Sequence, residues 1–358
     1  MPDDRSIELL RSLSEAAGPP GAEDEVRAIV HRTLDGAGSI RHDRLGSLLC
    51  EKRGSSDTPR VVLDSHLDEV GFMVQSISPE GKLALVALGG WWGHVLLGQR
   101  VDVLTANGPV PGVIGATPPH FLSPEERQTV LALDKMYVDV GASAAGEVEA
   151  LGVQVGDPVV PHTSFRAMAV DGIVSGKAFD DRVGVCLMCE TMLALGDRDH
   201  PNTVIGVGAV QEELGSRGAG TASELTRPDV AIVLEGTPAD DLPGQSDRQG
   251  ALGRGPQVRL FDPTAVPNRR LVQFVREVAR DAGVAVQLAV RRTGGTDAAT
   301  IHRSGAGVAA VVIGVPVRYI HSHVSLLQWS DYLAARRLVL ELVARLDDDR
   351  AATFTHYV

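Results

Sequence analysis

Two adjacent glutamates, Glu212 and Glu213, stand at the end of an apolar run that has the composition of a buried strand. The run, Thr203–Val210, is rich in β-branched and small residues and lacks polar alternation, which favours a strand covered on both faces. Two carboxylates close together in a poorly hydrated place would raise each other's pKa and destabilise the fold. A bound cation removes this objection, because one carboxylate can bind the cation while its neighbour handles a proton. Taken alone, the stretch slightly favours the other interpretation, a solvated strand end at which both acids face water.

A histidine flanked by two aspartates follows a second apolar run, Val61–Leu63. Asp64, His66 and Asp68 have i, i+2, i+4 spacing, which puts all three side chains on one face of an extended chain. A histidine in such a group can bind a metal while a carboxylate helps to fix the orientation of its ring. Considered alone, the pattern is explained better by a core histidine that is hydrogen-bonded to Asp68.

Three more stretches carry side chains that can bind a metal. Asp180 and Asp181 lie between a turn and an apolar helical run, where either aspartate could instead cap the helix. Glu235 ends a further apolar run, and His321 and His323 follow the last one. Each position has an ordinary structural explanation, so the weight of the pattern depends on whether the positions meet in space.

The elements predicted from the sequence bring these positions together. One helix is predicted at 5–17, a second begins at 23, a third ends at about 195, and two more cover 267–283 and 329–347. Strands are predicted at 45–52, 60–64, 203–210, 229–234, 284–290 and 307–314. Their alternation predicts a mostly parallel sheet with helices on both faces, in which sites lie at the carboxyl ends of strands. Five of the polar residues lie just past a predicted strand: His66, Glu212, Glu213, Glu235 and His321. Unrelated surface residues would not be expected to agree in this way, so the agreement favours one shared site.

The pattern changes between Gly71 and His162. Short β-rich pieces alternate there with Gly, Pro and Asn turns, and few long helical patterns occur. This texture predicts a small β-barrel inserted into the α/β domain, so that residues 1–70 and 163–358 form the main domain and 71–162 the insertion. The segment PPHFLSPEERQ within the insertion is predicted to be a loop with a short helix.

The overall composition limits what the protein can bind. Its 358 residues exceed one compact core, so two domains are expected. A net charge of −12 repels phosphate backbones and anionic lipid, and aromatic residues, at 4%, are too few for a stacking surface or a membrane belt. Nucleic acid and membranes are therefore not expected partners.

Cysteine usage and the N-terminal residues predict a cytoplasmic protein. The three cysteines, Cys50, Cys186 and Cys189, are too few for a disulfide framework. Cys186 and Cys189 have Cys-x-x-Cys spacing but lie in an apolar helical run, which favours two buried thiols over a redox or zinc motif. The opening residues, MPDDRSIELLRSL, lack the apolar core of a signal peptide, and no apolar stretch reaches the roughly 18 residues that span a bilayer.

Five short motifs spread along the chain carry a resemblance to a known family. SHLDEVGF, GKAFDDRVG, VQEELGSRGA, GGTDA and VPVRYIHS resemble those of the tetrahedral (TET), or deblocking, aminopeptidases. These are dinuclear metallopeptidases of the glutamyl aminopeptidase type, including FrvX-like proteins, and some relatives are labelled endoglucanases. The resemblance covers nearly the whole chain and implies a zinc-peptidase-like α/β core with an inserted β-barrel.

The resemblance implies two divalent metal ions per subunit. Asp180 matches the aspartate that bridges both ions, and His66 matches a ligand of the first ion. Glu213 and His321 match ligands of the second ion. Glu235 falls where the family usually has an aspartate that completes the first site. Nitrogen and oxygen ligands without thiolate suit zinc or cobalt, and also manganese.

The same resemblance implies a reaction and its general base. Glu212 matches the base, and Asp68 matches the acid that supports His66. Two divalent ions lower the pKa of a shared water and polarise the scissile carbonyl. Glu212 takes the proton of that water and passes it to the leaving amine. The expected activity is removal of N-terminal residues from short peptides, and a cis bond is expected between Asp180 and Asp181.

Two positions depart from the family pattern. Glu235 is one methylene longer than the usual aspartate, and in more distant relatives of this core a glutamate there accompanies carboxypeptidase activity. His323 and Ser325 replace a proline and a glutamate, and His323 is expected to lie behind the metal ligands or to be exposed. A carboxypeptidase or small-amide deacylase is therefore the alternative function. A non-enzymatic assembly protein is disfavoured, because every expected ligand position carries a side chain that can bind a metal.

The inserted β region implies assembly of several copies. Similar proteins form dimers through this domain and often stack the dimers into a hollow tetrahedral dodecamer. We therefore expect at least a dimer, and a shell of this kind would admit only short peptides.

Overall fold

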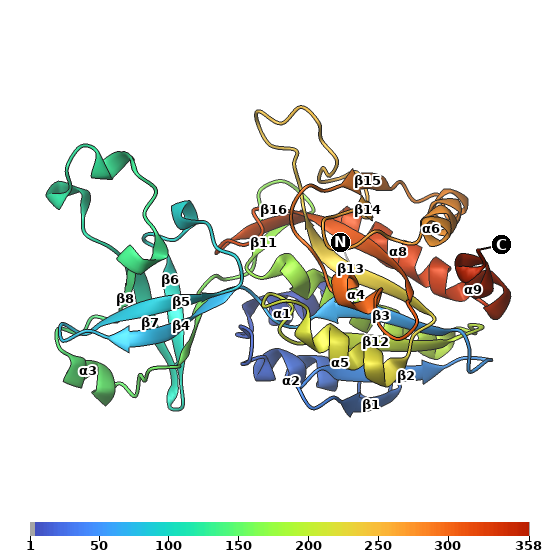
Figure 1. Cartoon of the computed structure of the whole chain (residues 1–358), viewed down its shortest axis with the longest axis horizontal. Coiled ribbons are helices and arrows are strands. Elements are labelled where there is room, and N and C mark those ends of the chain that lie inside the picture. The colour runs from blue at the N-terminus through green and yellow to red at the C-terminus, as the bar shows by residue number, and fades with distance from the viewer. Residues whose placement is uncertain (1–3, 358) are drawn as a thin grey trace.

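The computed structural model describes residues 4–357, in two parts of unequal size. Figure 1 shows a small β-barrel on one side and a large α/β part on the other, joined by extended segments of chain. Residues 1–3 lie outside the described range. They belong to the opening stretch in which no signal peptide was expected. Among residues 4–357, no helix is both long and apolar enough to cross a membrane.

Helices and strands alternate in the large part, as the sequence pattern predicts. The α-helices are α1 Asp4–Glu15, α2 Asp24–Thr33, α3 Ala145–Ala150, α4 Phe179–Ala194, α5 Arg217–Thr226, α6 Arg269–Asp281, α7 Ala298–Ile301, α8 Trp329–Ala344 and α9 Asp348–Thr355. All of them except α3 belong to the large part. Its strands are β1 Ser39–His42, β2 Leu48–Arg53, β3 Arg60–His66, β10 Arg166–Ala167, β11 Ile173–Gly176, β12 Thr203–Ala209, β13 Val230–Pro238, β14 Gln257–Phe261, β15 Gln287–Val290, β16 Ala309–Arg318 and β17 Ser325–Gln328.

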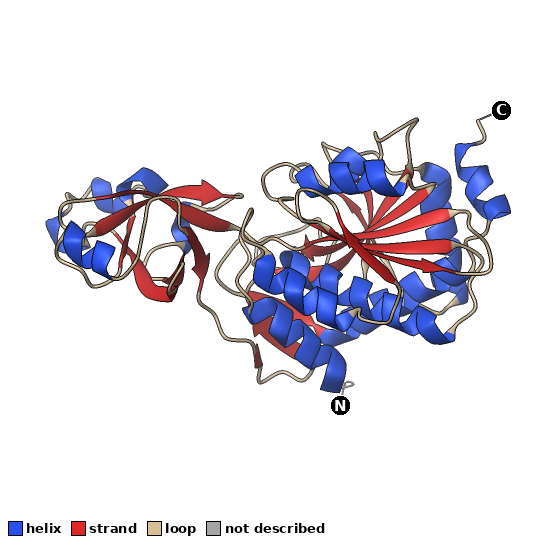
Figure 2. Ribbon diagram, turned by 90° about the horizontal axis from the view of Figure 1, so that it is seen from below, coloured by secondary structure: helices blue, strands red, loops and turns tan. Residues whose placement is uncertain are grey.

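One mixed sheet of eleven strands forms the centre of the large part. Its order is β1-β2-β12-β3-β13-β16-β17-β11-β10, with β14 pairing with β16 and β15 with β14. Strands β12, β3, β13 and β16 run parallel, and their side chains are almost all buried because helices cover both faces of the sheet (Figure 2). The parallel register brings the carboxyl ends of these strands to one edge, where Ala209 pairs with His66.

Helix α4 lies in the thicker helical layer and explains the apolar run around the cysteines. It packs against β3 and β13 on one side and against α1 and α8 on others, so its residues from Val183 to Met192 are buried. Cys186 and Cys189 are free thiols in this core, as predicted, and burial raises the pKa of both. The opposite face of the sheet carries the thinner layer of α5 and α7.

The inserted region folds as a closed barrel with its own core. Phe72, Val103 and Val138 are among the side chains that fill this core. The predicted loop at 118–128 contains two short 3-10 turns, at 119–121 and 126–128. The six barrel strands are β4 Gly71–Ile77, β5 Lys82–Leu88, β6 Arg100–Thr105, β7 Gly108–Gly115, β8 Tyr137–Asp139 and β9 Pro158–Pro161.

The predicted fold, an α/β core with an inserted β-barrel, is confirmed, and the differences lie in short elements. Strand β17 was not predicted, because its four residues, SLLQ, are too few to show an alternation. Helix α5 was missed because its sequence, RGAGTASELT, contains two glycines and few apolar residues. Close packing explains the first of these glycines, since a Cβ on Gly218 would lie 2.5 Å from the Val210 carbonyl oxygen.

Candidate metal centre

Side chains from the parallel strands and from α4 meet at the carboxyl edge of the sheet, where they line one cavity. The structure thus brings together every residue that the sequence singled out as a metal ligand or as the general base. The residues that meet are His66 at the end of β3, Asp180 in the first turn of α4, Glu212 and Glu213 after β12, Glu235 in β13 and His321 after β16.

Asp180 lies between the two histidines of this group. Its Oδ1 is 3.3 Å from His66 Nε2, and its Oδ2 is 3.4 Å from His321 Nε2. The Nε2 of His321 is also 3.4 Å from Glu213 Oε1, and that of His66 is 3.9 Å from Glu235 Oε2. One carboxylate is therefore shared by two groups, each of which has its own histidine and its own glutamate.

Each group has the composition and spacing of a site that could hold a metal ion. Nitrogen and oxygen donors of this kind suit zinc, cobalt or manganese. The donors present therefore fit two divalent cations that share Asp180. A further set, made of His66, Glu212 and Glu213, overlaps the two. In the two principal sets the ligand atoms lie within 4.8 Å of one another, and the members are His66, Asp180 and Glu235 in one and Asp180, Glu213 and His321 in the other.

The acids of the site are largely buried and repel one another. Burial raises the pKa of Glu212 and of Glu213 to about 8, and it raises the pKa of Glu235 well above its ordinary value. Burial also acts to raise the pKa of Asp180, but hydrogen bonds with the two histidines outweigh it and lower the pKa of that carboxyl. Glutamates whose ionised form is this costly favour a bound cation.

Hydrogen bonds behind the imidazole rings leave one nitrogen of each histidine free for a metal. His66 Nδ1 is 3.1 Å from the backbone oxygen of Asp68, and His321 Nδ1 is 2.8 Å from the backbone oxygen of Gly90. A carbonyl oxygen can only accept, so these contacts place a proton on Nδ1 of each ring and leave Nε2 facing the acids. While the ring is protonated, its Nε2–H donates to Asp180, and once that second proton is lost the Nε2 lone pair faces the acids. This is the tautomer that a histidine ligand needs.

The contact with Gly90 shows that a loop of the inserted barrel reaches the site. Two glycines in succession allow this close approach, because a Cβ on Gly89 would lie 3.0 Å from Glu213 Oε2 and one on Gly90 would lie 3.2 Å from His321 Nδ1. Gly89 also has a φ of +86°, which other residues rarely adopt. We call this loop the glycine loop (residues 89–92). Its backbone lies directly against Glu213 and His321, which with Asp180 form the second ligand group.

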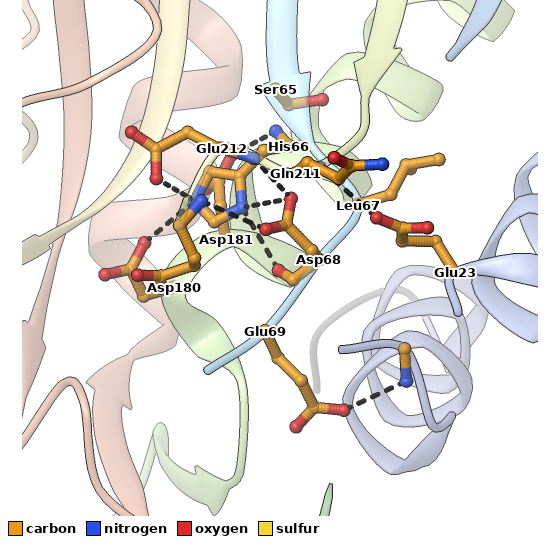
Figure 3. Close-up of polar contacts among 12 residues, drawn as sticks. Glu23, Ser65, His66, Leu67, Asp68, Glu69, Asp180, Asp181, Gln211 and Glu212 are labelled. Atoms are coloured by element: carbon orange, nitrogen blue, oxygen red, sulfur yellow. Dashed lines mark hydrogen bonds and ion pairs between the residues drawn. The ribbon is translucent and has the colours of Figure 1, made fainter. Parts of the chain in front are cut away.

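Asp68 contacts both His66 and Glu212 (Figure 3). Its carboxylate accepts hydrogen bonds from the backbone N–H groups of Glu212, at 2.9 Å, and Glu213, at 3.0 Å. The same carboxylate lies 3.5 Å from His66 Nδ1, farther than the Asp68 carbonyl oxygen. Asp68 therefore orients His66 mainly through its backbone. Through its side chain it holds residues 211–213, which we call the glutamate turn.

Asp181, which the sequence marked only as a possible helix cap, connects three segments that carry ligands. Its buried carboxylate accepts hydrogen bonds from the N–H groups of His66 at 3.1 Å, Gly184 at 3.0 Å and Gly236 at 2.9 Å. Those groups belong to β3, α4 and β13, and burial raises the pKa of the Asp181 carboxyl well above its usual range. The peptide bond between Asp180 and Asp181 is cis, as predicted.

Two further buried acids, Asp64 and Asp297, lie beside the ligand groups. Burial raises the pKa of Asp64 to about 7 and that of Asp297 well above its ordinary value. The sequence placed Asp64 on the same strand face as His66 without giving it a role. Asp297 was missed, and its one signal was its place in the motif GGTDA.

His323 is buried and stands outside the ligand groups. Its ring packs against Trp91 of the glycine loop, with 5.3 Å between the ring centroids. Burial lowers the pKa of this imidazole to about 4. Of the two expected places, behind the ligands or exposed, the structure therefore excludes the exposed one.

A cavity of about 560 Å³ opens over the ligand groups, and part of its wall is basic. Arg259 and Arg291 in this wall pair with Asp262 at 3.2 Å and Asp240 at 2.9 Å. Arg303 also lines the cavity, and among residues 4–357 no carboxylate oxygen lies within 4.0 Å of its guanidinium. The acids that line the cavity all belong to the ligand groups, so the rest of the wall favours negative charge.

Known proteins resemble this chain over nearly its whole length. A family model described as M42 glutamyl aminopeptidase matches residues 46–338. The chain is 32% identical to the glutamyl aminopeptidase of Lactococcus lactis subsp. cremoris (strain MG1363), over 98% of this chain and 99% of the relative. The TET aminopeptidase of Thaumarchaeota archaeon SCGC AB-539-E09 has a similar structure, with a TM-score of 0.96 and 44% identity over 98% of this chain and 100% of that one. The Pyrococcus horikoshii TET1 peptidase, described as assembling into a tetrahedron or a large octahedral shell, gives a TM-score of 0.85 and 30% identity over 95% of this chain and 100% of that one.

Proposed function

The chain belongs to the M42 glutamyl aminopeptidase family and is a peptidase, and we propose that it uses two divalent metal ions to remove N-terminal residues from short peptides. The observation that carries this proposal is the position of Asp180, whose two carboxylate oxygens face two separate ligand groups. Because the donors are nitrogen and oxygen alone, we propose zinc or cobalt as the metal, with manganese as a third candidate.

The proposed roles divide the site into two halves. Two ions held there would supply the Lewis acidity that lowers the pKa of a water molecule and polarises the scissile carbonyl. Asp68 is proposed to orient the ring of His66, so that its Nε2 faces the first ion. The proposed ligands are His66 and Glu235 for the first ion, Glu213 and His321 for the second, and Asp180 for both.

Glu212 is the proposed general base. Its carboxylate lines the cavity, 4.0 Å from His66 Nε2, while its backbone is held by Asp68. From there it accepts the proton of the attacking water and passes it to the nitrogen of the leaving amine. Glu213 is directed to His321 instead, so the two adjacent glutamates have different proposed roles.

The basic part of the cavity wall supports a preference for an acidic N-terminal residue. A glutamate or aspartate side chain would gain a charge-assisted hydrogen bond from a guanidinium, whereas a lysine side chain would be repelled. Arg303 is the residue that we assign to this contact, because Arg259 and Arg291 already have carboxylate partners. The name of the Lactococcus lactis relative, glutamyl aminopeptidase, points the same way.

A panel of short peptide amides tests both the reaction and its preference. The metal-depleted protein is supplied with zinc, cobalt or manganese and given peptides that begin with glutamate, leucine or lysine, each with a free or an acetylated N-terminus. We expect release of the first residue from the free-amine peptides alone, fastest for glutamate. Cleavage that needs a free C-terminal carboxylate would support the carboxypeptidase alternative. Release of acetate would support the deacylase, and no cleavage with metal bound would contradict a peptidase role for this site.

We propose that the inserted barrel, residues 71–162, joins two copies of the chain, with the peptidase domain made of residues 1–70 and 163–358. The Pyrococcus horikoshii relative, described as assembling into a tetrahedron or a large octahedral shell, supports the assembly of several copies. A shell would admit short peptides and exclude folded proteins. A cytoplasmic location stays a prediction from the sequence.

A further inference from the structure

Three consecutive backbone N–H groups of the glutamate turn are held by two buried carboxylates. Asp68 accepts from Glu212 and Glu213, as described above. The N–H of Gln211, the residue before them, donates to Glu23 Oε1 at 3.2 Å (Figure 3). Glu23 comes from the N-terminal end of α2, far from the site in sequence, and it is absent from the family motifs quoted above. The turn that presents the proposed base is therefore fixed from two sides.

The side chain of Glu23 is itself fixed by its surroundings, so it can hold the glutamate turn in place. It occupies the N-cap position of α2, and only 2% of its surface is exposed. Its Oε1 also accepts the N–H of Gly21 at 2.9 Å, and its Oε2 lies 3.9 Å from Arg27 Nη2. The single oxygen Oε1 therefore joins the N–H of Gln211 to that of Gly21, while the Arg27 guanidinium lies near the other oxygen.

The backbone of Gln211 shows why such a contact matters. Its φ is +58°, in the left-handed region that residues other than glycine rarely occupy. A residue in this conformation relaxes unless its surroundings enforce it. A relaxed Gln211 would rotate the next residue, Glu212, away from its place in the cavity wall. We propose that Glu23 is a positioning residue that keeps Gln211 left-handed and so directs Glu212 at the attacking water.

This inference rests on the proposed role of Glu212 as the base, and it adds a residue that touches neither metal nor substrate. Glu25 provides a matched control, because it lies in the same helix and accepts the N–H of Ala17 at 2.9 Å with its Oε2. It therefore braces the same N-terminal segment, but no hydrogen bond joins it to the glutamate turn among residues 4–357.

Steady-state kinetics of the full-length, metal-loaded protein tests the inference. We expect Glu23→Ala to lower kcat about ten- to a hundredfold with KM and metal content unchanged, the scale of a slightly misplaced catalytic group. Glu23→Asp should lose as much, because the shorter side chain keeps the charge but does not reach Gln211. Glu23→Gln keeps an acceptor oxygen and should stay within about threefold of the parent, and Glu25→Ala within about twofold. Equal losses in Glu23→Ala and Glu25→Ala, or a full kcat in both Glu23→Ala and Glu23→Asp, would overturn the inference.

Hydrogen exchange supplies a readout that does not depend on activity. The amide of Gln211 should be protected in the parent and in Glu23→Gln, and it should exchange faster in Glu23→Ala and Glu23→Asp. In a Glu23→Ala background, the added change Gln211→Gly should recover part of the lost kcat, because glycine adopts a positive φ without strain. Unchanged protection in every variant would refute the contact. An active Glu212→Gln variant would refute the proposed base instead, and so the two failures are distinguishable.

Discussion

Glu212 and Glu213 show how one step along the chain separates two proposed roles. Both are largely buried, and burial raises the pKa of each to about 8, so their ionisation alone does not tell them apart. Their neighbours do, because Glu213 Oε1 lies 3.4 Å from His321 Nε2 while Glu212 Oε2 lies 4.0 Å from His66 Nε2. Glu213 forms a set with Asp180 and His321, whereas Glu212 belongs to neither set that contains Asp180, and we therefore propose Glu213 as the ligand and Glu212 as the base.

A glutamine at position 212 tests this division. Glu212→Gln keeps the size and hydrogen bonds of the side chain but cannot accept the water's proton, so kcat should fall at least about a hundredfold. Metal content measured by mass spectrometry should stay at the parent level. The paired variant Glu213→Gln should lose metal from the second site as well as activity. Near-parent turnover in Glu212→Gln would remove the base from its assigned position.

The longer arm of Glu235 belongs to the first ligand group, and shortening it should weaken that site. Its Oε2 lies 3.9 Å from His66 Nε2, on a side chain that is almost fully buried. We expect Glu235→Asp to lower metal occupancy and turnover, because a carboxylate withdrawn by one methylene no longer reaches the ion, and Glu235→Ala to lower them further. Full occupancy with unchanged turnover in both variants would show that this glutamate is not a ligand.

At the scale of elements, the sequence predicted which residues meet better than it predicted the segments around them. Buried strands that end on acids or histidines, such as β3 at His66, are visible because an apolar run followed by a charge is a local pattern. The parallel arrangement of such strands then implies that their ends meet. Asp181 was not recognised, because its role consists of hydrogen bonds to the N–H groups of His66, Gly184 and Gly236, which lie far apart in sequence.

The glycine loop could not be recognised from the sequence for a similar reason. The pair Gly89–Gly90 has the composition of an ordinary turn between strands. The pair matters because it lies close to Glu213 and His321, and only the folded chain shows this contact between the barrel and the ligand groups. Glu23 likewise has the appearance of a helix N-terminal acid until the structure shows its contact with Gln211.

A methyl group at Gly90 should disturb the proposed second metal site selectively. A Cβ there would lie 3.2 Å from His321 Nδ1, tighter than an ordinary contact, so Gly90→Ala should push the ring away from its carbonyl acceptor. We expect about tenfold weaker binding of the second metal in a titration, with the first little changed, a typical cost for disturbing the partner of a ligand. Gly146→Ala is the matched control, because nothing lies within 4 Å of the added Cβ in barrel helix α3. Equal metal affinity in both variants would contradict this reading of the loop.

At the scale of the whole molecule, the metals should determine how stability depends on pH. Burial raises the pKa of Glu212 and Glu213 from 4.5 to about 8. Burial acts to lower the pKa of His321, but its hydrogen bond with Asp180 outweighs that and raises it from 6.5 to about 9. All three groups bind protons more tightly in the folded than in the unfolded chain, so their contribution is present at low pH and is lost as pH rises through these values.

The metal-free protein should therefore become less stable between about pH 5 and pH 9, because its unfolded state binds fewer protons than its folded state over that range. Cations compete with these protons and replace their charge, so the metal-loaded protein should lose this slope. Thermal unfolding of chelated and reconstituted samples across the range measures the difference. Parallel pH profiles for the two samples would argue against a cation at the acid cluster.

The barrel surface predicts that the chain does not remain alone in solution. Phe121, Trp92 and Val155 are large apolar residues of the barrel with 80%, 63% and 63% of their surface exposed. Exposed apolar groups of this size are common in interfaces between proteins. Light scattering at micromolar concentration should give a mass of at least two subunits, and a monomer mass would count against assembly through the barrel.

The glycine loop also decides how this protein can be rebuilt by an engineer. An inserted domain usually invites exchange or deletion, because its core is its own. Here a carbonyl of the insertion is the hydrogen-bond acceptor of His321, a proposed ligand, so excising the barrel at its strands would leave this histidine without the partner that fixes its tautomer. A working chimera must keep residues 89–92 with the peptidase core and make its junctions outside them. Any strain that two joined copies impose on the barrel would reach the chemistry by the same short path.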